Sequence, residues 1–275
     1  MFTWTKTIAM ALAMAGVLLA AVALTAAQAT AGTLQEVKNN GVLRVAGVIY
    51  RPLILRRPNG EYQGIDIEIL GGFAAANGVK LEIIDTGWDT AVAGLGSGKW
   101  DVVPAICVTP ARQEVVDFSS AVMQLGGVLV VLKDNAEINS IADANKPGVV
   151  FADMTGTWNE AISLEAFPQA QHKTFGQSSD EQMVLELMSG RADAIITDSP
   201  VTVSLILEKF GDKFRFFPGK DKPLDVQPCP VAYAIAKGAE DLQTALSAHI
   251  AELKASGKID ELYKKYLTSE YILTK

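Results

Sequence analysis

A short stretch of this sequence occurs twice, 92 residues apart. Residues 97–103 read Ser-Gly-Lys-Trp-Asp-Val-Val, and residues 189–195 read Ser-Gly-Arg-Ala-Asp-Ala-Ile. Each copy follows a helix-like stretch, 90–95 or 180–188, and each continues into an apolar strand. The glycine suits the left-handed cap that ends a helix, and a continuous apolar run is typical of a strand buried on both faces. The repeat therefore favours two similar α/β lobes over turn chemistry that any α/β protein shares.

The rest of the chain alternates between strand-like and helix-like segments. Asp66 is the expected N-cap of a helix over 66–77, and Gly78 is its expected stop. We expect further helices after 156–157 and over 241–253 and 259–266. We expect strands over 42–46, 81–85, 102–106, 126–132, 149–151, 194–197 and 231–236. This alternation predicts mostly parallel sheets, with any ligand at the carboxyl ends of the strands.

The first 31 residues have the pattern of an export signal. Lys6 is the only charge before an apolar run over 8–26, and small residues then allow cleavage after Ala29 or Ala31. The run is long enough that an uncleaved membrane anchor is the alternative. Cleavage after Ala31 leaves 244 of the 275 residues and, with Lys6 lost, changes the formal charge from −7 to −8. We therefore expect a periplasmic protein.

Composition excludes several classes of function. The acidic balance and the lack of a basic cluster argue against nucleic acid. His172 and His249 are the only histidines, and the sequence has neither a metal-ligand cluster nor a phosphate-binding glycine loop, so we expect no metal and no cofactor. Two cysteines in an exported chain, Cys107 and Cys229, are able to form one disulfide. The sequence leaves open whether they do.

Arg112 is the candidate ligand-binding residue with the clearest local context. It follows the apolar strand over 102–106 and the turn Thr109-Pro110-Ala111. An arginine at the end of a buried strand can face a cleft, where its planar guanidinium suits a bidentate grip on a carboxylate or phosphate. The alternative is a surface or interlobe ion pair.

Taken together, these motifs make the chain resemble the extracellular solute-binding proteins, family 3, the capture subunits of polar amino-acid ABC importers. The resemblance covers essentially the whole mature chain and rests on short segments in the family's order. These segments are Gly41-Val42-Leu43-Arg44-Val45, Gly64-Ile65-Asp66-Ile67-Glu68, Trp88-Asp89, residues 97–101, Thr109-Pro110-Ala111-Arg112, Val116-Asp117-Phe118-Ser119, Gly156-Thr157, and Ala192-Asp193-Ala194 leading to Asp198.

The resemblance implies an α/β, two-lobed periplasmic-binding-protein fold of type II. Each lobe would hold a mostly parallel sheet flanked by helices, with crossover strands as the hinge. We expect a signal peptide over 1–31, lobe 1 over 32–125 and 237–275, and lobe 2 over 126–236. Such a protein captures an amino acid or related zwitterion by hinge closure. It then delivers the ligand, as a monomer, to an ABC transporter permease in the inner membrane.

The family pattern also implies roles for charged and polar residues. Arg112 would hold the α-carboxylate of the ligand, and Asp198 would take its α-ammonium. Asp198 is alternatively a turn or cap residue beside Ser199-Pro200. Thr157 begins a helix, so its hydroxyl and nearby backbone N–H groups would add donors to the carboxylate. Thr157 is alternatively a plain N-cap.

Four further positions complete the expected ligand-binding set. Tyr50 and Trp88 match aromatic walls around the ligand side chain, with the hydrophobic core as their alternative place. Ala105 matches a position whose backbone carbonyl accepts from the ammonium. Cys107 stands where the family usually has a serine or threonine hydroxyl. Because a thiol is a poor donor, this contact would rest on the backbone.

The sequence says less about the side chain of the ligand and about catalysis than about the charged contacts. Met154 and Trp88 favour a neutral or apolar ligand side chain, whereas Arg51 near the cleft mouth opposes that choice. We expect no enzymatic activity. The alternatives are a cyclohexadienyl or arogenate dehydratase-like enzyme, in which Glu160 would be the candidate general acid, and a ligand-sensing accessory protein.

Overall fold

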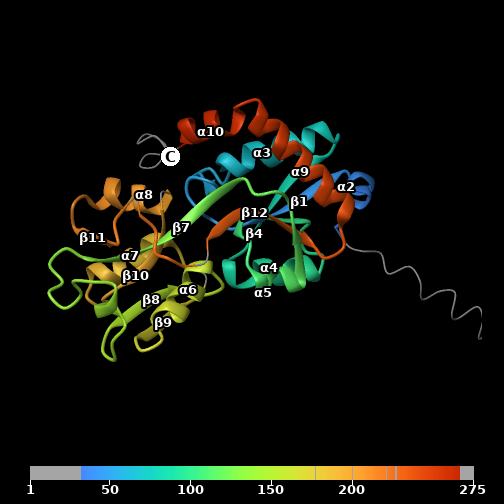
Figure 1. Cartoon of the computed structure of the whole chain (residues 1–275). Helices are drawn as coiled ribbons and strands as arrows, with labels where there is room; N and C mark the ends of the chain where they lie inside the picture. Colours follow the sequence, from blue (N-terminus) through green and yellow to red (C-terminus); the bar gives the residue numbers. More distant parts are fainter. Residues whose placement is uncertain (1–31, 177, 200, 221, 227, 267–275) are drawn as a thin grey trace, which may run out of the picture. The chain divides into compact units, whose positions relative to one another are not determined.

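The computed structural model describes residues 32–266 except 177, 200, 221 and 227 (Figure 1). The strands are β1 (Val42–Gly47), β2 (Leu55–Arg56), β3 (Tyr62–Gln63), β4 (Lys80–Asp85), β5 (Val102–Cys107), β6 (Val116–Phe118), β7 (Met123–Leu132), β8 (Val150–Met154), β9 (Gln171–Phe175), β10 (Ile195–Ser199), β11 (Phe214–Phe217) and β12 (Cys229–Ala236). The helices are α2 (Leu34–Asn40), α3 (Ile65–Ala76), α4 (Trp88–Gly96), α5 (Pro110–Val115), α6 (Trp158–Ala166), α7 (Asp180–Met188), α8 (Val201–Phe210), α9 (Glu240–Ala255) and α10 (Lys258–Tyr266), with the 3-10 turn η1 (Ala142–Ala144). The predicted export signal lies outside the described residues.

Every helix and strand predicted from the sequence is present, with ends that shift by a few residues. The helix predicted over 180–188 is α7. One detail is wrong: Gly64, not Asp66, is the N-cap of α3, and it makes no side-chain cap bond. Asp66 lies in the first turn, where it is buried and accepts a hydrogen bond from Tyr233 Oη at 3.0 Å. It acts as a core residue because its side chain turns inward.

Parallel pairing follows from the helices that connect successive strands. β1 pairs in parallel with β4 and with β5, and the chain reaches these strands through α3 and α4. β8 pairs in parallel with β9 across α6. A helical crossover returns the chain to the end of the sheet where the previous strand began, so the next strand runs in the same direction. The α/β class predicted from the sequence is confirmed.

Two long strands, β7 and β12, join the two groups of strands. The start of β7 pairs with β12 through Leu125 and Cys229, and its end pairs antiparallel with β10 and β11 (Figure 1). β6 pairs antiparallel with the end of β12 on the same side as β7, and β5 pairs antiparallel with β12 on the other side. Apart from the short β2–β3 pair, every antiparallel pair of strands includes β7 or β12. The predicted lobe boundaries stay a proposal. β12 pairs with β7 at its first residues and with β5 and β6 over the rest of its length, which favours a return of the chain to the first lobe at the start of β12.

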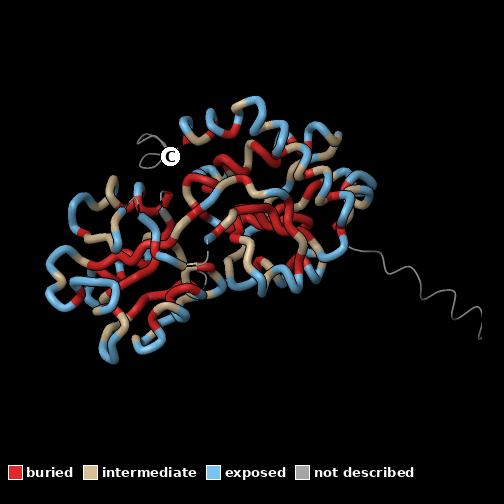
Figure 2. The backbone as a smooth tube through the Cα atoms, viewed as in Figure 1, coloured by how far each residue is buried: buried red, intermediate tan, exposed pale blue. Residues whose placement is uncertain are grey.

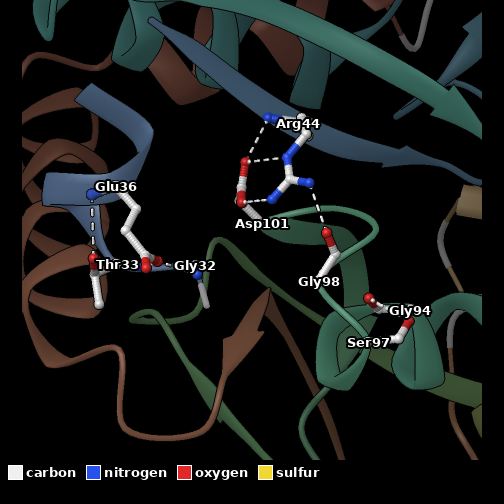
Figure 3. A network of polar contacts seen from close by, with 8 residues as sticks. All are labelled: Gly32, Thr33, Glu36, Arg44, Gly94, Ser97, Gly98 and Asp101. Atoms are coloured by element: carbon white, nitrogen blue, oxygen red, sulfur yellow. Dashed lines mark hydrogen bonds and ion pairs between the residues drawn. The ribbon is translucent and has the colours of Figure 1, made fainter. Parts of the chain in front are cut away.

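The repeated sequence forms the same structure twice. The Asp101 carboxylate accepts from the Arg44 backbone N–H at 2.8 Å (Figure 3). The Asp101 N–H donates to the Arg44 carbonyl at 2.8 Å. In the second copy, Asp193 accepts from the Val150 N–H at 2.9 Å and its own N–H donates to the Val150 carbonyl at 2.7 Å. Each aspartate therefore fixes the strand that follows it to an earlier strand, β5 to β1 and β10 to β8.

The glycines of the two copies also match. Gly98 follows α4 with φ 67°, and Gly190 follows α7 with φ 68°. These left-handed angles end a helix with little strain only at a residue that lacks a Cβ. The matching angles and aspartate bonds support the interpretation of the repeat as one supersecondary unit used in each lobe.

The hydrophobic core follows the strands (Figure 2). All six residues of β5 are buried, as expected for a strand covered on both faces. Buried apolar side chains form three clusters, and Trp88 packs against all three. None of the described helices combines the length and hydropathy needed to cross a bilayer.

Candidate ligand-binding site

The carboxyl ends of β5 and β10 border a pocket. All seven residues predicted as ligand-binding line this pocket, although they come from segments far apart in the sequence. The pocket is lined by Tyr50, Trp88, Ala105, Ile106, Cys107, Arg112, Leu125, Met154, Thr157, Trp158, Asn159, Asp180 and Asp198.

Arg112 reaches the pocket from the first turn of α5. The Thr109 side chain caps this helix by accepting from the Arg112 backbone N–H at 3.3 Å. The guanidinium donates to two carbonyls, Cys107 O at 2.8 Å and Gly156 O at 2.9 Å. No carboxylate among the described residues forms an ion pair with it, so the alternative role in an ion pair is not observed. Burial lowers its pKa to about 10, which leaves it charged at neutral pH. Two of its five N–H donors are used, and three remain.

Asp198 enters the pocket from β10 and is 6% exposed. It lies within the strand rather than in a turn. Its Oδ2 accepts from Tyr50 Oη at 2.9 Å and from Asn159 Nδ2 at 3.3 Å. Burial raises its pKa to about 6, and the two hydrogen bonds limit that rise. The group is therefore mostly ionised at neutral pH, and no cation of the described residues pairs with it.

Tyr50 and Trp88 form an aromatic corner of the pocket. Their rings meet edge to face with centroids 6.2 Å apart. Tyr50 is held in place by reciprocal backbone hydrogen bonds with Ile54, and its hydroxyl donates to Asp198 from the other lobe. Trp88 is the first residue of α4. The aromatic wall and the core interpretation are thus compatible, because Tyr50 is buried and still lines the pocket.

Ala105 has a backbone conformation that few residues with a Cβ adopt, with φ 54°. The pairing of β12 with β5 shifts register here, so that Pro104 and Ala105 lie opposite the single residue Tyr233. This is a β-bulge, which also explains how a proline is tolerated inside a central strand. The bulge places the bent backbone of β5 in the pocket wall.

Cys107 and Cys229 form a disulfide, with their Cα atoms 5.0 Å apart. The bond joins the end of β5 to the start of β12. Cys107 therefore has no S–H to offer a ligand. Its polar contribution to the site is its backbone carbonyl, which holds the Arg112 guanidinium.

Thr157 is the N-cap of α6, and its hydroxyl oxygen accepts from the Glu160 N–H at 3.1 Å. Its hydroxyl and its backbone N–H both donate to the Met154 carbonyl, at 2.7 and 3.2 Å. The expectation that the Thr157 hydroxyl donates to the ligand therefore does not match this geometry. The free donors at this helix start are the backbone N–H groups of Trp158 and Asn159, because the first N–H groups of a helix have no partner within it.

Glu160 and Arg51, which the sequence suggested for the cleft, contact other residues of the protein instead. Glu160, the candidate general acid of the enzyme alternative, accepts from the Gly156 N–H at 2.8 Å and does not line the pocket. Arg51 lies 3.7 Å from Glu181 in an ion pair and also does not line the pocket. Neither geometry supports a direct role for these side chains at the ligand.

Sequence reasoning missed three polar pocket residues. Trp158 and Asn159 follow the predicted Thr157 directly, so the first turn of α6 was the available signal. The Trp158 Nε1 and Asn159 Oδ1 atoms are buried and have no hydrogen-bond partner. Asp180 begins α7, and a first-turn aspartate is ordinarily a helix-dipole residue. Burial and the charges of Asp198 and Glu181 raise its pKa to about 8.

Known proteins match the chain over most of its length. Residues 43–269 match the model of the bacterial extracellular solute-binding proteins, family 3. The ABC transporter glutamine-binding protein GlnH of Bacillus subtilis is 27% identical over 245 residues, which cover 86% of this chain and 85% of that protein. These matches agree with the resemblance that the sequence motifs indicated.

Solved structures agree in fold. The ancestral amino acid-binding protein AncCDT-1, a precursor of cyclohexadienyl dehydratase, is 35% identical with a TM-score of 0.74, covering 86% of this chain and 99% of that chain. The amino acid ABC transporter substrate-binding protein AbpA of Streptococcus pneumoniae, bound to L-arginine, is 25% identical with a TM-score of 0.75, at 86% and 99% coverage. The predicted type II fold is confirmed. The chain belongs to the bacterial extracellular solute-binding proteins, family 3.

Proposed function

We propose that this protein captures an amino acid or a related zwitterion between its two lobes for an ABC importer. One observation carries the proposal. Arg112 and Asp198 line the same pocket from different lobes, carry opposite charges, and do not pair with each other. A ligand with a carboxylate and an ammonium group is complementary to both.

The carboxylate end would lie between Arg112 and the start of α6. Arg112 has three unused N–H donors, and its contact with the Cys107 carbonyl fixes the plane of the guanidinium. The backbone N–H groups of Trp158 and Asn159 add donors at the positive end of the helix dipole. A planar guanidinium and a helix start together suit a carboxylate better than a single point charge does.

The ammonium end would bind at Asp198. The Tyr50 hydroxyl and the Asn159 amide both donate to Oδ2, which orients the carboxylate and leaves Oδ1 free of these two contacts. The carbonyl of Ala105, in the bulge of β5, is the proposed second acceptor for the ammonium.

Hinge closure would couple this binding to transport. Two hydrogen bonds already join the lobes beside the pocket: Tyr50 Oη to Asp198, and Arg112 Nη2 to the Gly156 carbonyl. A zwitterion that bridges Arg112 and Asp198 interacts with both lobes only when they are close, so it stabilises the closed form. A monomeric closed protein is the form that we propose the inner-membrane permease recognises.

Export completes the proposal. Residues 1–31 would be a signal peptide cleaved after Ala29 or Ala31, releasing the protein into the periplasm. Mass spectrometry of the protein from the periplasmic fraction is expected to find an N-terminus at Thr30 or Gly32. An intact Met1 would instead support an uncleaved anchor.

Calorimetric titration tests the binding function. The purified protein is titrated with L-amino acids, and the tightest ligand is then compared with its decarboxylated and deaminated analogues. We expect a free amino acid to bind and both analogues to lose at least tenfold in affinity. At 100 times the dissociation constant, the ligand should stabilise the protein by about 2.7 kcal/mol. A protein that binds no zwitterion, or that binds both analogues equally well, would contradict the proposal.

An enzymatic role is the second candidate, and the similarity to a precursor of cyclohexadienyl dehydratase favours testing it. A general acid needs a proton and access to the ligand. Glu160 serves as a cap outside the pocket, but Asp180 lines it with a raised pKa. We propose that the protein has no such activity, and that prephenate and arogenate remain unchanged on incubation with it. Turnover that disappears in Asp180→Asn would establish the enzyme.

A further inference from the structure

Asp180 is the charged pocket residue that a simple zwitterion does not use. It is the first residue of α7 and lines the pocket together with Asp198. Its neighbour Glu181 pairs with Arg51 at 3.7 Å and with Lys209 at 4.0 Å. Asp180 has no ion pair with any residue that the structure describes. One acid of this helix start is thus neutralised within the protein, and the other faces the pocket.

The charges that line the pocket do not balance. Arg112, Asp180 and Asp198 are its ionisable residues, and with both carboxyl groups ionised they carry one positive and two negative charges. The α-carboxylate and α-ammonium of a ligand account for Arg112 and Asp198. Asp180 remains, and an uncompensated carboxylate in a closed pocket is costly. A ligand that carries one extra positive charge would restore the balance.

The other groups in the pocket suit such a ligand. The Asn159 Oδ1 atom is a buried acceptor without a partner, and a side-chain ammonium or guanidinium supplies several N–H donors. Trp88 and Tyr50 offer aromatic faces that attract cations. Met154 and Trp88, which from sequence favoured an apolar side chain, suit the methylene stem of a long cationic one.

We propose that Asp180 binds a second positive charge at the end of the ligand side chain, so that the site selects cationic amino acids. This inference rests on the proposed function and specifies its substrate class. The state of Asp180 in the empty pocket agrees with it: burial and the charges of Asp198 and Glu181 raise its pKa to about 8. A cation bound beside the carboxylate removes this unfavourable interaction and lowers the pKa again.

Matched ligand pairs test the role of Asp180. The wild-type protein, Asp180→Asn and Glu181→Gln are titrated calorimetrically with L-arginine and its neutral isostere L-citrulline, and with L-lysine and L-norleucine. Glu181→Gln is the control, because it removes a charge from the same helix turn without changing the pocket lining. Melting curves verify that all three proteins are folded.

We expect the wild-type protein to bind at least one cationic ligand about 30-fold or more tighter than its neutral partner, as for a buried charge pair. Asp180→Asn should reduce this preference to within about threefold, and Glu181→Gln should retain it. Tight binding of a neutral amino acid with an unchanged ligand preference in Asp180→Asn would overturn the inference and leave the proposed function intact. If none of the four ligands nor any other zwitterion binds, both fail.

Discussion

Gly156 is the residue at which a single added methyl group should block closure. It follows β8 with φ 82°, and its carbonyl accepts from Arg112 across the pocket. A Cβ placed on it would lie 2.8 Å from the Trp88 carbonyl oxygen and 3.0 Å from the Asp89 Cα. Both contacts are with the backbone of α4 in the other lobe, which cannot rotate away as a side chain can. Gly156→Ala should therefore hold the lobes apart.

The expected loss of ligand affinity in Gly156→Ala follows from two separate free-energy costs. An alanine at φ 82° is strained by about 1–2 kcal/mol, and that strain is present whether the lobes are open or closed. The clash with α4 arises only on closure, and overpacking of this kind typically costs about 1–3 kcal/mol. Because only the second cost differs between the two states, ligand affinity should fall about 5- to 150-fold.

Gly190→Ala is the matched control. Gly190 has a similar angle, φ 68°, but nothing lies within 4 Å of an added Cβ. Both variants should melt at a lower temperature than the wild-type protein, and calorimetric titration should find weaker binding only in Gly156→Ala. Small-angle scattering with ligand should find Gly156→Ala less compact than the control. Wild-type affinity in Gly156→Ala would refute the reasoning that the lobes close onto this glycine.

Three other variants test separate parts of the account. Asp66→Asn should raise the melting temperature at pH 8 more than at pH 4. Burial raises the pKa of Asp66 to about 7, so the ionised side chain destabilises the fold increasingly from pH 4 to 7, by up to about 4 kcal/mol; an equal gain at both pH values would contradict this. Replacing Cys107 and Cys229 together by serine should lower the unfolding free energy by about 2–5 kcal/mol in chemical denaturation, and no change would mean that the disulfide does not form. Tyr50→Phe removes a hydrogen bond that lowers the pKa of Asp198, so ammonium binding in titrations should weaken more at pH 6 than at pH 8; an equal loss at both would argue against this coupling.

The fold was largely predictable because its signals are local. The repeated Ser-Gly-x-x-Asp pattern sets a helix end, a left-handed glycine and a strand within seven residues, and both copies form as expected. Asp66 was assigned wrongly for a tertiary reason. A cap position is a local preference, whereas the contact with Tyr233 joins residues 167 positions apart and turns the side chain inward.

The residues that line the pocket were partly predictable from the sequence, but their contacts were not. The resemblance identified seven residues of the pocket, yet it gave no account of which of their donors are already used. Thr157 directs both of its donors to the Met154 carbonyl, and Tyr50 binds Asp198 across 148 residues of sequence. Asp180 escaped notice because an aspartate in the first turn of a helix is common, and only its position in the lining of the pocket distinguishes it.

The central claim is that Arg112 holds the ligand carboxylate. A thermodynamic cycle that combines a change of Arg112 with a change of the ligand carboxylate tests it most directly. The tightest-binding amino acid and its methyl ester are titrated into the wild-type protein and into Arg112→Ala. In the wild-type protein, the ester should bind about 2–5 kcal/mol more weakly, because it lacks the charge that pairs with Arg112. In Arg112→Ala, the ester penalty should shrink to about 1 kcal/mol or less, the share that the start of α6 contributes. An ester penalty of the same size in both proteins would show that the carboxylate binds elsewhere.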